Sequence, residues 1–241
     1  MSGHSHAKTI MATKMANDAK KGKIYSKYGR LITIAVKDGG GSGDPATNAK
    51  LKTVIEQAKN ANMPKENIER AIKKGTGELA SEALEGVSIE GFGPGGIALI
   101  IEGITDNKNR TVNEIKSILN QNNGKMAGEG AVRWMFERKG SITVSTEGKT
   151  KEDLELLAIE AGADDVSWRD STMDIYTKPE DLEIVKKNLE EKQLKIESSS
   201  LEWVAKEEVS ISEKEKAQAQ TLFEALDEND SINDIFSNLK G

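Results

Sequence analysis

Apolar residues recur at helical spacing through the first third of the chain, and no run there alternates with the period of a strand. A basic stretch at residues 14–21 predicts a short helix. Gly22 interrupts the pattern, and a longer amphipathic helix follows it as far as the glycine cluster at residues 39–43. The chain therefore opens with helices rather than with a sheet.

Two further helices complete this first region. Asp44 and Pro45 have the chemistry of a helix N-terminus, so we expect the second long helix to begin there. A shorter helix follows Pro64, and we expect it to end at Gly75. Short helices joined by short turns pack as a bundle. We therefore predict a helical domain over residues 1–77, followed by a polar linker.

Beyond the linker the pattern changes to apolar runs of strand length. A strand at residues 83–93 leads through a glycine cluster directly into a second strand at residues 97–104. A phosphate-binding loop has the opposite order, because its glycines follow a strand and open a helix. This cluster therefore predicts a turn into a strand, and its structural residues are Gly93, Pro94, Gly95 and Gly96.

The second strand ends in the polar sequence TDNKNRT at residues 105–111. Thr111 and Glu114 have the spacing of a capping box, which predicts a helix from Thr111 to the Asn-Asn-Gly sequence that starts at residue 122. Polar side chains in such loops usually bond their own backbone, so we expect a rigid loop at residues 105–110. Arg110 is its best candidate for phosphate contact. The other structural residues of the loop are Asp106, Asn107 and Asn109.

The middle of the chain predicts a domain inserted in another. A strand is expected at residues 131–140, and residues 140–204 then follow the order β-α-β-β-α-β, which is that of a ferredoxin-like domain. Chain segments of this kind are tolerated as insertions when their two ends lie close together. Residues 140–204 are therefore predicted to fold as a unit of their own.

The end of the chain predicts one more helix and one more strand. Ser212 and Glu215 form a capping box that opens the helix. These two elements cannot form a domain alone, so we expect them to complete the sheet begun before the insertion. The predicted fold class is α+β and multidomain: an N-terminal three-helix bundle, a discontinuous α/β domain of residues 78–139 and 205–241, and the inserted ferredoxin-like domain.

Composition limits the chemistry that the chain can perform. Its 241 residues include no cysteine and only two histidines, His4 and His6. Thiolate nucleophiles and triads with a histidine elsewhere in the chain are therefore excluded, and a metal site at these histidines would need remote carboxylates. The longest apolar run, residues 97–101, is far shorter than the ~20 residues of a membrane span. With no secretory signal visible, we expect a cytoplasmic protein that binds no cofactor, metal, membrane or small-molecule substrate.

Charge is distributed unevenly along the chain. Residues 1–77 contain 15 basic and 6 acidic residues and carry a net charge of +9, whereas the rest of the chain carries −15. A basic region in an otherwise acidic protein is typical of proteins that bind phosphate groups, although a solvated helical surface gives the same pattern. The cations that we expect to contact nucleic acid are Lys8, Lys14, Lys20, Lys21, Lys23, Lys27, Arg30, Lys65, Lys73 and Lys74.

Several motifs resemble the YebC family, a bacterial group with a mitochondrial relative that acts as a translational activator. They include GHS at residues 3–5, DAKKGKIYSKYGRLITIA from residue 18, GFGPGGIALIIE from residue 91, TDNKNRT, and WMFERKG from residue 134. The resemblance spans nearly the whole chain and implies a three-helix N-terminal domain, two α/β domains and no enzymatic activity. After Ser5 the family usually continues with Lys-Trp and a denser basic run, so we expect the tip of this chain to bind RNA more weakly or differently.

The resemblance implies a ribosome-associated factor that contacts rRNA or tRNA and relieves stalling, especially on proline-rich stretches. With such a partner, we expect the rigid loop at residues 105–110 to contact the ribosome or a neighbouring domain. Family members have also been described as DNA-binding transcriptional regulators, which makes duplex DNA the alternative partner. Lysines attract phosphate without reading bases, and the helical region has only two arginines, Arg30 and Arg70, so we favour backbone contact. An enzyme built on carboxylates such as Glu102 and Asp106 is a third alternative that lacks partner residues.

Overall fold

The structure is a computed structural model that describes residues 18–80, 83–169 and 171–240. Its contacts divide the chain into two compact units. One holds the described residues up to Val132 together with Ile211–Ile235, and the other holds Arg133–Ser210 and the described residues from Phe236 onward. The predicted division into three domains stays a prediction.

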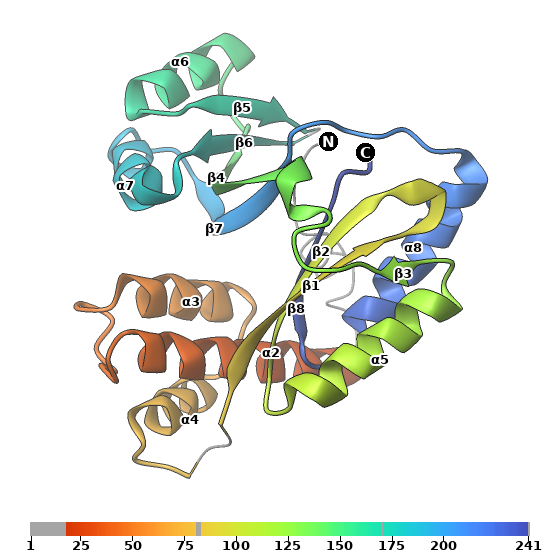
Figure 1. Cartoon of the computed structure of the whole chain (residues 1–241). Helices are drawn as coiled ribbons and strands as arrows, with labels where there is room; N and C mark the ends of the chain where they lie inside the picture. Colours follow the sequence, from red (N-terminus) through yellow and green to blue (C-terminus); the bar gives the residue numbers. More distant parts are fainter. Residues whose placement is uncertain (1–17, 81–82, 170, 241) are drawn as a thin grey trace. The chain divides into compact units, whose positions relative to one another are not determined.

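The first unit begins with three helices, α2 (Asp18–Asp38), α3 (Ala49–Asn60) and α4 (Lys65–Thr76), which pack together as the predicted bundle (Figure 1). Each helix turns one apolar stripe inward, as amphipathic helices do. The core of the bundle is formed by Ile32, Ala35, Val36, Leu51, Val54, Ile55, Ala58, Met63, Ile68 and Ala71.

Two of the predicted helix starts in the bundle are wrong. α2 runs through Gly22 without a break, because a single glycine in a helix costs only about 1 kcal/mol relative to alanine. α3 begins at Ala49 rather than at Asp44, since the side chain of Asn48 accepts the hydrogen bond that caps the helix, from the backbone N–H of Leu51 at 3.0 Å.

The predicted end of α4 is also wrong. The helix continues past Gly75 to Thr76, and Gly77, with a φ of 85°, ends it in the left-handed conformation that glycine favours. Gly75 serves the packing of the bundle instead. A Cβ atom at this position would lie 2.6 Å from the Cβ of Val36, so only glycine allows α4 to approach α2 this closely.

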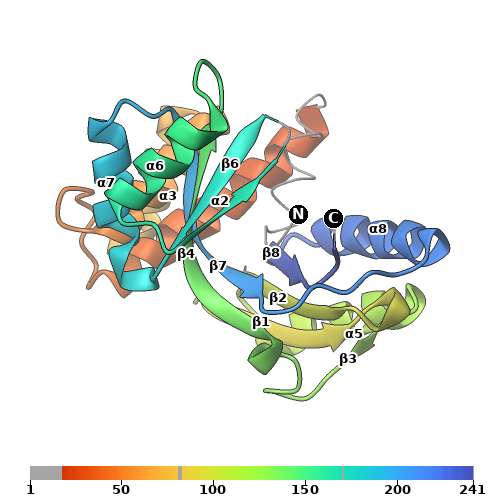
Figure 2. The same cartoon turned by 90° about the horizontal axis from the view of Figure 1, so that it is seen from above.

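The first sheet has the strand order β3-β1-β2-β8 and also belongs to the first unit, except for the end of β8. Its strands are β1 (Glu85–Phe92), β2 (Ala98–Thr105), β3 (Lys125–Met126) and β8 (Ile232–Ser237). Helices α5 (Lys108–Gln121) and α8 (Glu213–Asp227) lie along it, as Figures 1 and 2 show. Because β8 pairs with β2, the prediction that the end of the chain completes this sheet is confirmed. The capping box at the start of α8 is present as predicted.

The glycine cluster forms the turn between β1 and β2 and includes the short helix η1 (Pro94–Gly96). Gly93 donates its N–H to the carbonyl of Ile97 at 2.8 Å, which starts the hairpin. Gly95 has a φ of 69°, and a Cβ there would lie 2.6 Å from the Cγ2 of Ile211. The predicted turn into a strand is therefore confirmed.

The second unit contains a four-stranded antiparallel sheet with the order β5-β6-β4-β7. Together with its two helices this is the predicted ferredoxin-like arrangement, with a core that includes Ile142, Leu154, Ile175 and Leu189. The elements are η2 (Arg133–Met135), β4 (Phe136–Ser145), α6 (Lys151–Ala161), β5 (Asp165–Trp168), β6 (Thr172–Thr177), η3 (Pro179–Asp181), α7 (Leu182–Glu191) and β7 (Ile196–Ala205).

One strand replaces two predicted ones in this sheet. The sequence predicts separate strands before and after Gly140, but β4 is continuous through it. Gly140 lies opposite Thr177 on one side and Leu201 on the other, so it takes part in both ladders. A Cβ there would lie 2.3 Å from the Oγ1 of Thr177. The glycine therefore marks a close approach inside a strand rather than an end.

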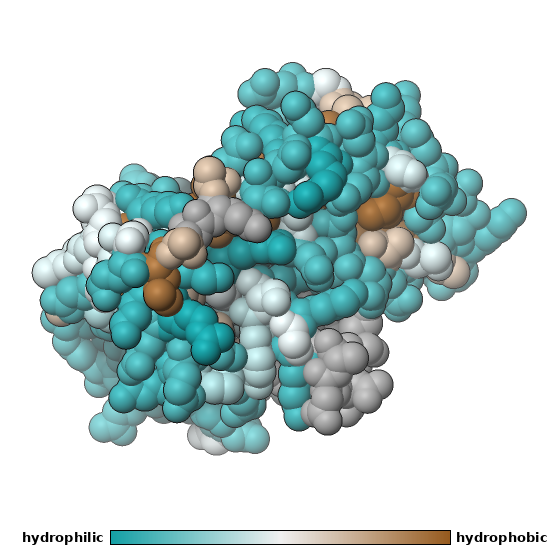
Figure 3. Space-filling view, turned by 90° about the horizontal axis from the view of Figure 1, so that it is seen from below, coloured by the Kyte–Doolittle hydropathy of each residue, from teal (hydrophilic) through white to brown (hydrophobic). Residues whose placement is uncertain are grey.

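Hydrophilic residues predominate on the face of the molecule that Figure 3 shows, and hydrophobic residues there are scattered. None of the helices in the described ranges combines the length and apolar character needed to cross a membrane.

Candidate nucleic-acid interface

A groove of about 610 Å³ lies between α2 and α4 in the first unit; we call it the α2–α4 groove. Residues one helical turn apart on α2 form its floor and have small side chains: Gly22, Ser26, Gly29 and Thr33. Beyond the backbone of α2 itself, a Cβ atom at Gly22 or Gly29 would meet no atom within 4 Å, so the space above these glycines is open. The sequence pattern thus produces a concave surface on an otherwise regular helix.

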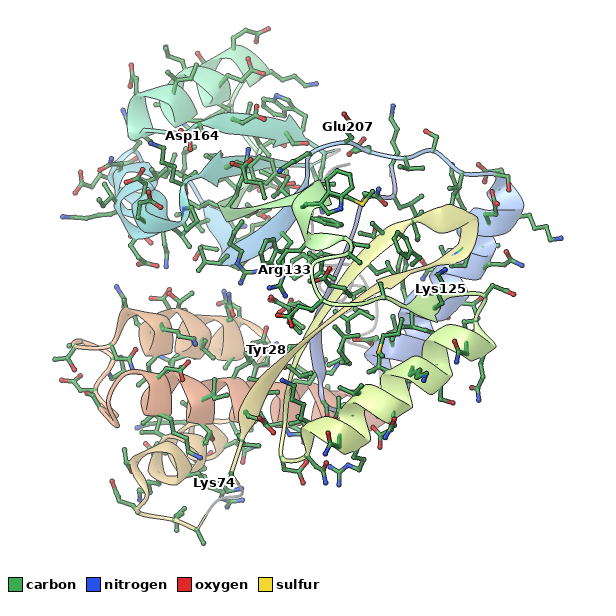
Figure 4. The ribbon with its side chains drawn as sticks, viewed as in Figure 1. Tyr28, Lys74, Lys125, Arg133, Asp164 and Glu207 are labelled. Atoms are coloured by element: carbon green, nitrogen blue, oxygen red, sulfur yellow. The ribbon has the colours of Figure 1, made fainter. Side chains whose placement is uncertain are left out.

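Three cations line this groove. Arg30 comes from α2, whereas Arg70 and Lys74 come from α4, one helical turn apart on the same face. Figure 4 shows Lys74 near the C-terminal end of α4. The described residues that line the groove include no carboxylate. Positive side chains around a concavity raise the local potential, which attracts an anion such as a phosphate diester.

Hydrogen bonds hold the two walls of the groove in place. Thr33 donates its hydroxyl to the carbonyl of Ala71 at 3.1 Å, which joins α2 to α4. Tyr25, which also lines the groove, donates its hydroxyl to the carbonyl of Asn62 at 2.8 Å. Arg30 donates from Nη1 to the carbonyl of Asp230 at 2.5 Å, and this bond orients the guanidinium. The groove is therefore formed before any ligand arrives.

The other cations on the same side of α2 are engaged within the protein. Lys23 bonds the carboxylate of Glu228, and this hydrogen bond raises the pKa of Lys23 above its ordinary value. Lys27 is only 3% exposed, and its Nζ lies 2.9 Å from Oδ1 of Asp227. Both acids lie at the C-terminal end of α8, where the helix dipole also favours cations. The predicted basic face of α2 is thus divided between α8 and the groove.

The remaining predicted cations are scattered. Lys21 and Lys73 are exposed, and Lys65 lies 3.6 Å from Glu69 on the surface of α4. Lys8, Lys14, His4 and His6 lie outside the described residues, and so does the side chain of Lys20. Within the described ranges, no three acidic or histidine side chains are gathered so that they could hold a metal ion.

Of the predicted cations, Arg30 and Lys74 line the groove. The prediction missed Arg70, together with the polar lining residues Tyr25 and Asn67. A signal for Arg70 was available, because it precedes Lys74 by four residues and therefore shares its helix face. No pattern in the sequence indicates that Arg70 and Lys74 lie beside α2, since only the packing of the two helices brings them together.

Helix α5, which follows the polar loop after β2, begins earlier than predicted. The helix starts at Lys108, and Asn107 is its N-cap, because its side chain accepts the backbone N–H of Arg110 at 3.0 Å. Thr111, which we expected to cap the helix, is buried within it and donates its hydroxyl to Oγ1 of Thr105 at 2.8 Å. The prediction of a Thr111 cap is wrong, since Asn107 supplies the cap one turn earlier.

Arg110 lies on the surface of α5 beside two carboxylates. Its Nη2 is 2.5 Å from Oδ1 of Asp106, and its Nε is 3.8 Å from Oε1 of Glu114. Asn109, by contrast, is exposed in the first turn of the helix. The two acids offset the charge that a phosphate would meet at Arg110. Its role as a phosphate contact stays a prediction, and the loop's contact with the ribosome or a neighbouring domain stays one too.

Comparison with known proteins assigns the chain to a family. A family model described as the TACO1/YebC protein N-terminal domain matches residues 5–78, and one described as the TACO1/YebC second and third domain matches residues 84–239. The chain belongs to the TACO1/YebC family. The resemblance seen in the sequence motifs is therefore confirmed.

Relatives in this family align along almost their whole length. A protein of Pseudothermotoga lettingae is 43% identical over 241 residues, which cover 100% of this chain and 94% of the relative. One from Dictyoglomus turgidum is 44% identical over 239 residues, covering 99% of this chain and 95% of the relative. Both carry the name "Probable transcriptional regulatory protein".

A solved structure has the same fold. The crystal structure of a conserved hypothetical protein from Aquifex aeolicus is similar to this chain with a TM-score of 0.85 at 42% identity. The match covers 92% of this chain and 91% of that protein. The predicted α+β fold class is thereby confirmed.

Proposed function

We propose that this protein is a non-enzymatic translation factor that associates with the ribosome by binding rRNA or tRNA phosphates in the α2–α4 groove. The groove carries the proposal, because Arg30, Arg70 and Lys74 converge on it from two helices. Contacts to backbone phosphates give affinity and position a partner without reading its sequence.

Relief of stalling, as the family resemblance implies for proline-rich stretches, needs binding rather than a catalytic group. A factor that holds a tRNA in a reactive orientation accelerates the ribosome's own reaction, because it lowers the entropic cost of reaching that orientation. The fixed walls of the groove suit this role, since Thr33 and Tyr25 hold α2 against α4 and its preceding turn.

A DNA-binding transcriptional regulator is the second candidate, and the names of the relatives favour it. Sequence-specific readout requires a helix that projects into the major groove and presents its side chains to base edges. Arg70 and Lys74 instead line a concavity between two helices, which suits a single strand or an RNA loop that enters it. The geometry therefore favours RNA over duplex DNA.

Sedimentation through sucrose gradients across a salt series tests the proposal. We expect the wild-type protein to migrate with ribosomes at low salt and to dissociate as salt rises. The double variant Arg70→Gln/Lys74→Gln should bind more weakly, and its slope of log K against log salt should be smaller by about 1.4, or about 0.7 for each phosphate contact.

The matched control is Lys52→Gln/Lys59→Gln, which removes the same charge from exposed positions of α3 outside the groove. If the control and the groove variant lose affinity equally, net charge rather than the groove explains binding. Absence of the wild-type protein from ribosomes at every salt concentration would reject the proposal. Preference for one duplex DNA sequence over bulk DNA by about a thousandfold would establish the regulator instead.

A further inference from the structure

The α2–α4 groove has two chemically different ends. Tyr25 bonds Asn62, just before α4, and Thr33, further along α2, bonds Ala71 within α4, so the two helices run in the same direction. The three cations lie toward the C-terminal end of the groove. The lining residues at the other end carry no charge; they are Gly22, Tyr25, Ser26, Met63 and Asn67. We call this the neutral end of the groove.

Two polar side chains at the neutral end can bond a ligand. Asn67 lies in the first turn of α4 and is partly exposed. Within the described ranges, neither its side-chain amide nor the hydroxyl of Ser26 forms a hydrogen bond. The amide of asparagine offers a donor beside an acceptor, a pattern that complements the edge of a nucleobase. Asn67 is therefore suited to recognise a neutral heterocycle rather than an anion.

The neutral end also provides surface for the flat face of a base. Met63 lines it and is only 7% exposed. The ring of Tyr25 lines it as well, and the hydrogen bond from its hydroxyl to the carbonyl of Asn62, at 2.8 Å, fixes the position of the ring. Unpaired bases stack on aromatic side chains of this kind. A base at this end would thus find a face to pack on and an amide to bond.

The dimensions of the groove suit one nucleotide. Its volume of about 610 Å³ lies within the range of roughly 300–1,000 Å³ that is typical of pockets for small ligands. Arg30 follows Ser26 by four residues on α2, and Arg70 follows Asn67 by three residues on α4. Each step is close to one helical turn, or about 5.4 Å along the axis. A nucleotide with its base at the neutral end would therefore place its phosphate among the cations.

We propose that the neutral end of the groove binds the base of one unpaired RNA nucleotide while the three cations hold the adjacent phosphates. Asn67 bonds the edge of the base, and Tyr25 packs against its face. A paired nucleotide does not fit this site, because its edge is occupied and its faces are stacked within the duplex. The inference rests on the proposed function and deepens it, since it names the group that enters the groove.

Binding of a short adenosine strand, compared with a strand of equal length and charge that lacks its bases, tests this inference. We expect the wild-type protein to prefer the adenosine strand by at least about fivefold, the lower limit for one stacked base. Asn67→Ala should weaken binding of the adenosine strand by about fivefold to a hundredfold, the range for one bonded base edge. Its affinity for the strand without bases and its salt slope should not change, because no charge is removed.

Two variants of Tyr25 test the packing of the base. Tyr25→Phe keeps the ring and should retain most of the preference for the adenosine strand. Tyr25→Leu removes the ring and should lose most of that preference, while the strand without bases still binds and shows that the groove is intact. Equal preferences in the two variants would overturn the role of Tyr25.

The matched control for Asn67 is Asn113→Ala, which removes an exposed amide from α5, outside the groove. Equal losses in Asn67→Ala and Asn113→Ala would overturn the inference. Equal affinity of the wild type for the two strands, with ribosome binding still weakened in Arg70→Gln/Lys74→Gln, would overturn the inference and leave the proposed function standing. Absence of the wild-type protein from ribosomes at every salt concentration would overturn both.

Discussion

Lys27 and Asp227 form a buried ion pair although they lie 200 positions apart in the chain. The Nζ of Lys27 is 2.9 Å from Oδ1 of Asp227, and the two side chains are 4% and 12% exposed. Lys27 also donates to the backbone carbonyl of Asp227 at 3.0 Å. The contact joins α2 to the C-terminal end of α8. Part of the basic charge of the helical bundle therefore holds α2 against α8.

Removing one member of this pair should be strongly destabilising. Lys27→Met removes the ammonium group that lies 2.9 Å from the buried carboxylate of Asp227, so we expect a loss of about 3–5 kcal/mol in the free energy of unfolding. The double variant Lys27→Met/Asp227→Leu should recover most of it, because neither charge of the pair remains buried. Urea unfolding measures both.

The pair between Lys50 and Asp38 provides the control for this prediction. Its side chains are 57% and 52% exposed, so Lys50→Met should cost at most about 1 kcal/mol. Equal effects of Lys27→Met and Lys50→Met would show that burial of the Lys27 pair has no energetic consequence.

Filling the groove should separate stability from binding. Gly29 lies in the interior of α2, and beyond the helix's own backbone no atom would lie within 4 Å of an added Cβ. Gly29→Leu should therefore stabilise the helix, by about 0.5–1 kcal/mol, while its side chain occupies the groove and abolishes ribosome binding. Gly29→Ala should give a similar gain in stability and keep most of the binding. Thermal unfolding and sedimentation provide the two readouts, and tight binding by Gly29→Leu would contradict a role for the groove.

The close approach of α2 and α4 should be sensitive to a single methyl group. Gly75→Ala places a Cβ 2.9 Å from the carbonyl oxygen of Thr33, in addition to its clash with Val36, so the helices must move apart. We expect a loss of about 1–3 kcal/mol, the usual range for overpacking, and weaker RNA binding as the groove widens. Gly22→Ala, at an open position of α2, should not be destabilising. Urea unfolding that ranks Gly75→Ala with Gly22→Ala would refute this explanation of Gly75.

Asp174 should give the ferredoxin-like unit a distinctive pH dependence. It is fully buried, and burial raises its pKa above the ordinary 3.8, although Arg169 and Thr143 partly oppose the shift. The folded state therefore holds the proton more tightly than the unfolded chain does. The resulting stabilisation is fully present below pH 3.8 and is lost as the pH rises through the folded-state pKa.

Asp174→Asn removes this titration. As the pH rises above about 3.8, the free energy of unfolding of the wild type should therefore fall relative to that of the variant. Urea unfolding at a series of pH values measures that difference. Parallel pH profiles for the two proteins would mean that Asp174 has the same proton affinity in the folded and unfolded states.

The sequence locates the basic region of the chain but does not distinguish the environments of its cations. Lys23 and Lys74 look alike in the sequence, since both are lysines on predicted basic helices. In the structure Lys23 bonds Glu228, whereas Lys74 lines the groove. Arg110, the predicted phosphate contact of the loop, lies beside Asp106. Each difference depends on which carboxylates lie nearby in space.

The sequence by itself determined the features that depend on neighbours three or four residues away. The capping box of Ser212 and Glu215 and the glycine turn between β1 and β2 involve such short-range contacts, and both occur as predicted. Hydrophobic periodicity likewise determined the order of strands and helices, because each element must bury one face.

Only the tertiary structure decided how distant segments use these elements. Gly75 reads as a helix end, but its missing Cβ matters because Val36 of another helix lies against it. The packing of α2 against α4 brings Arg30 and Arg70, which are 40 positions apart in the chain, to the same groove. Packing brings such residues together through the burial of apolar faces, and no local pattern encodes which polar side chains then become partners.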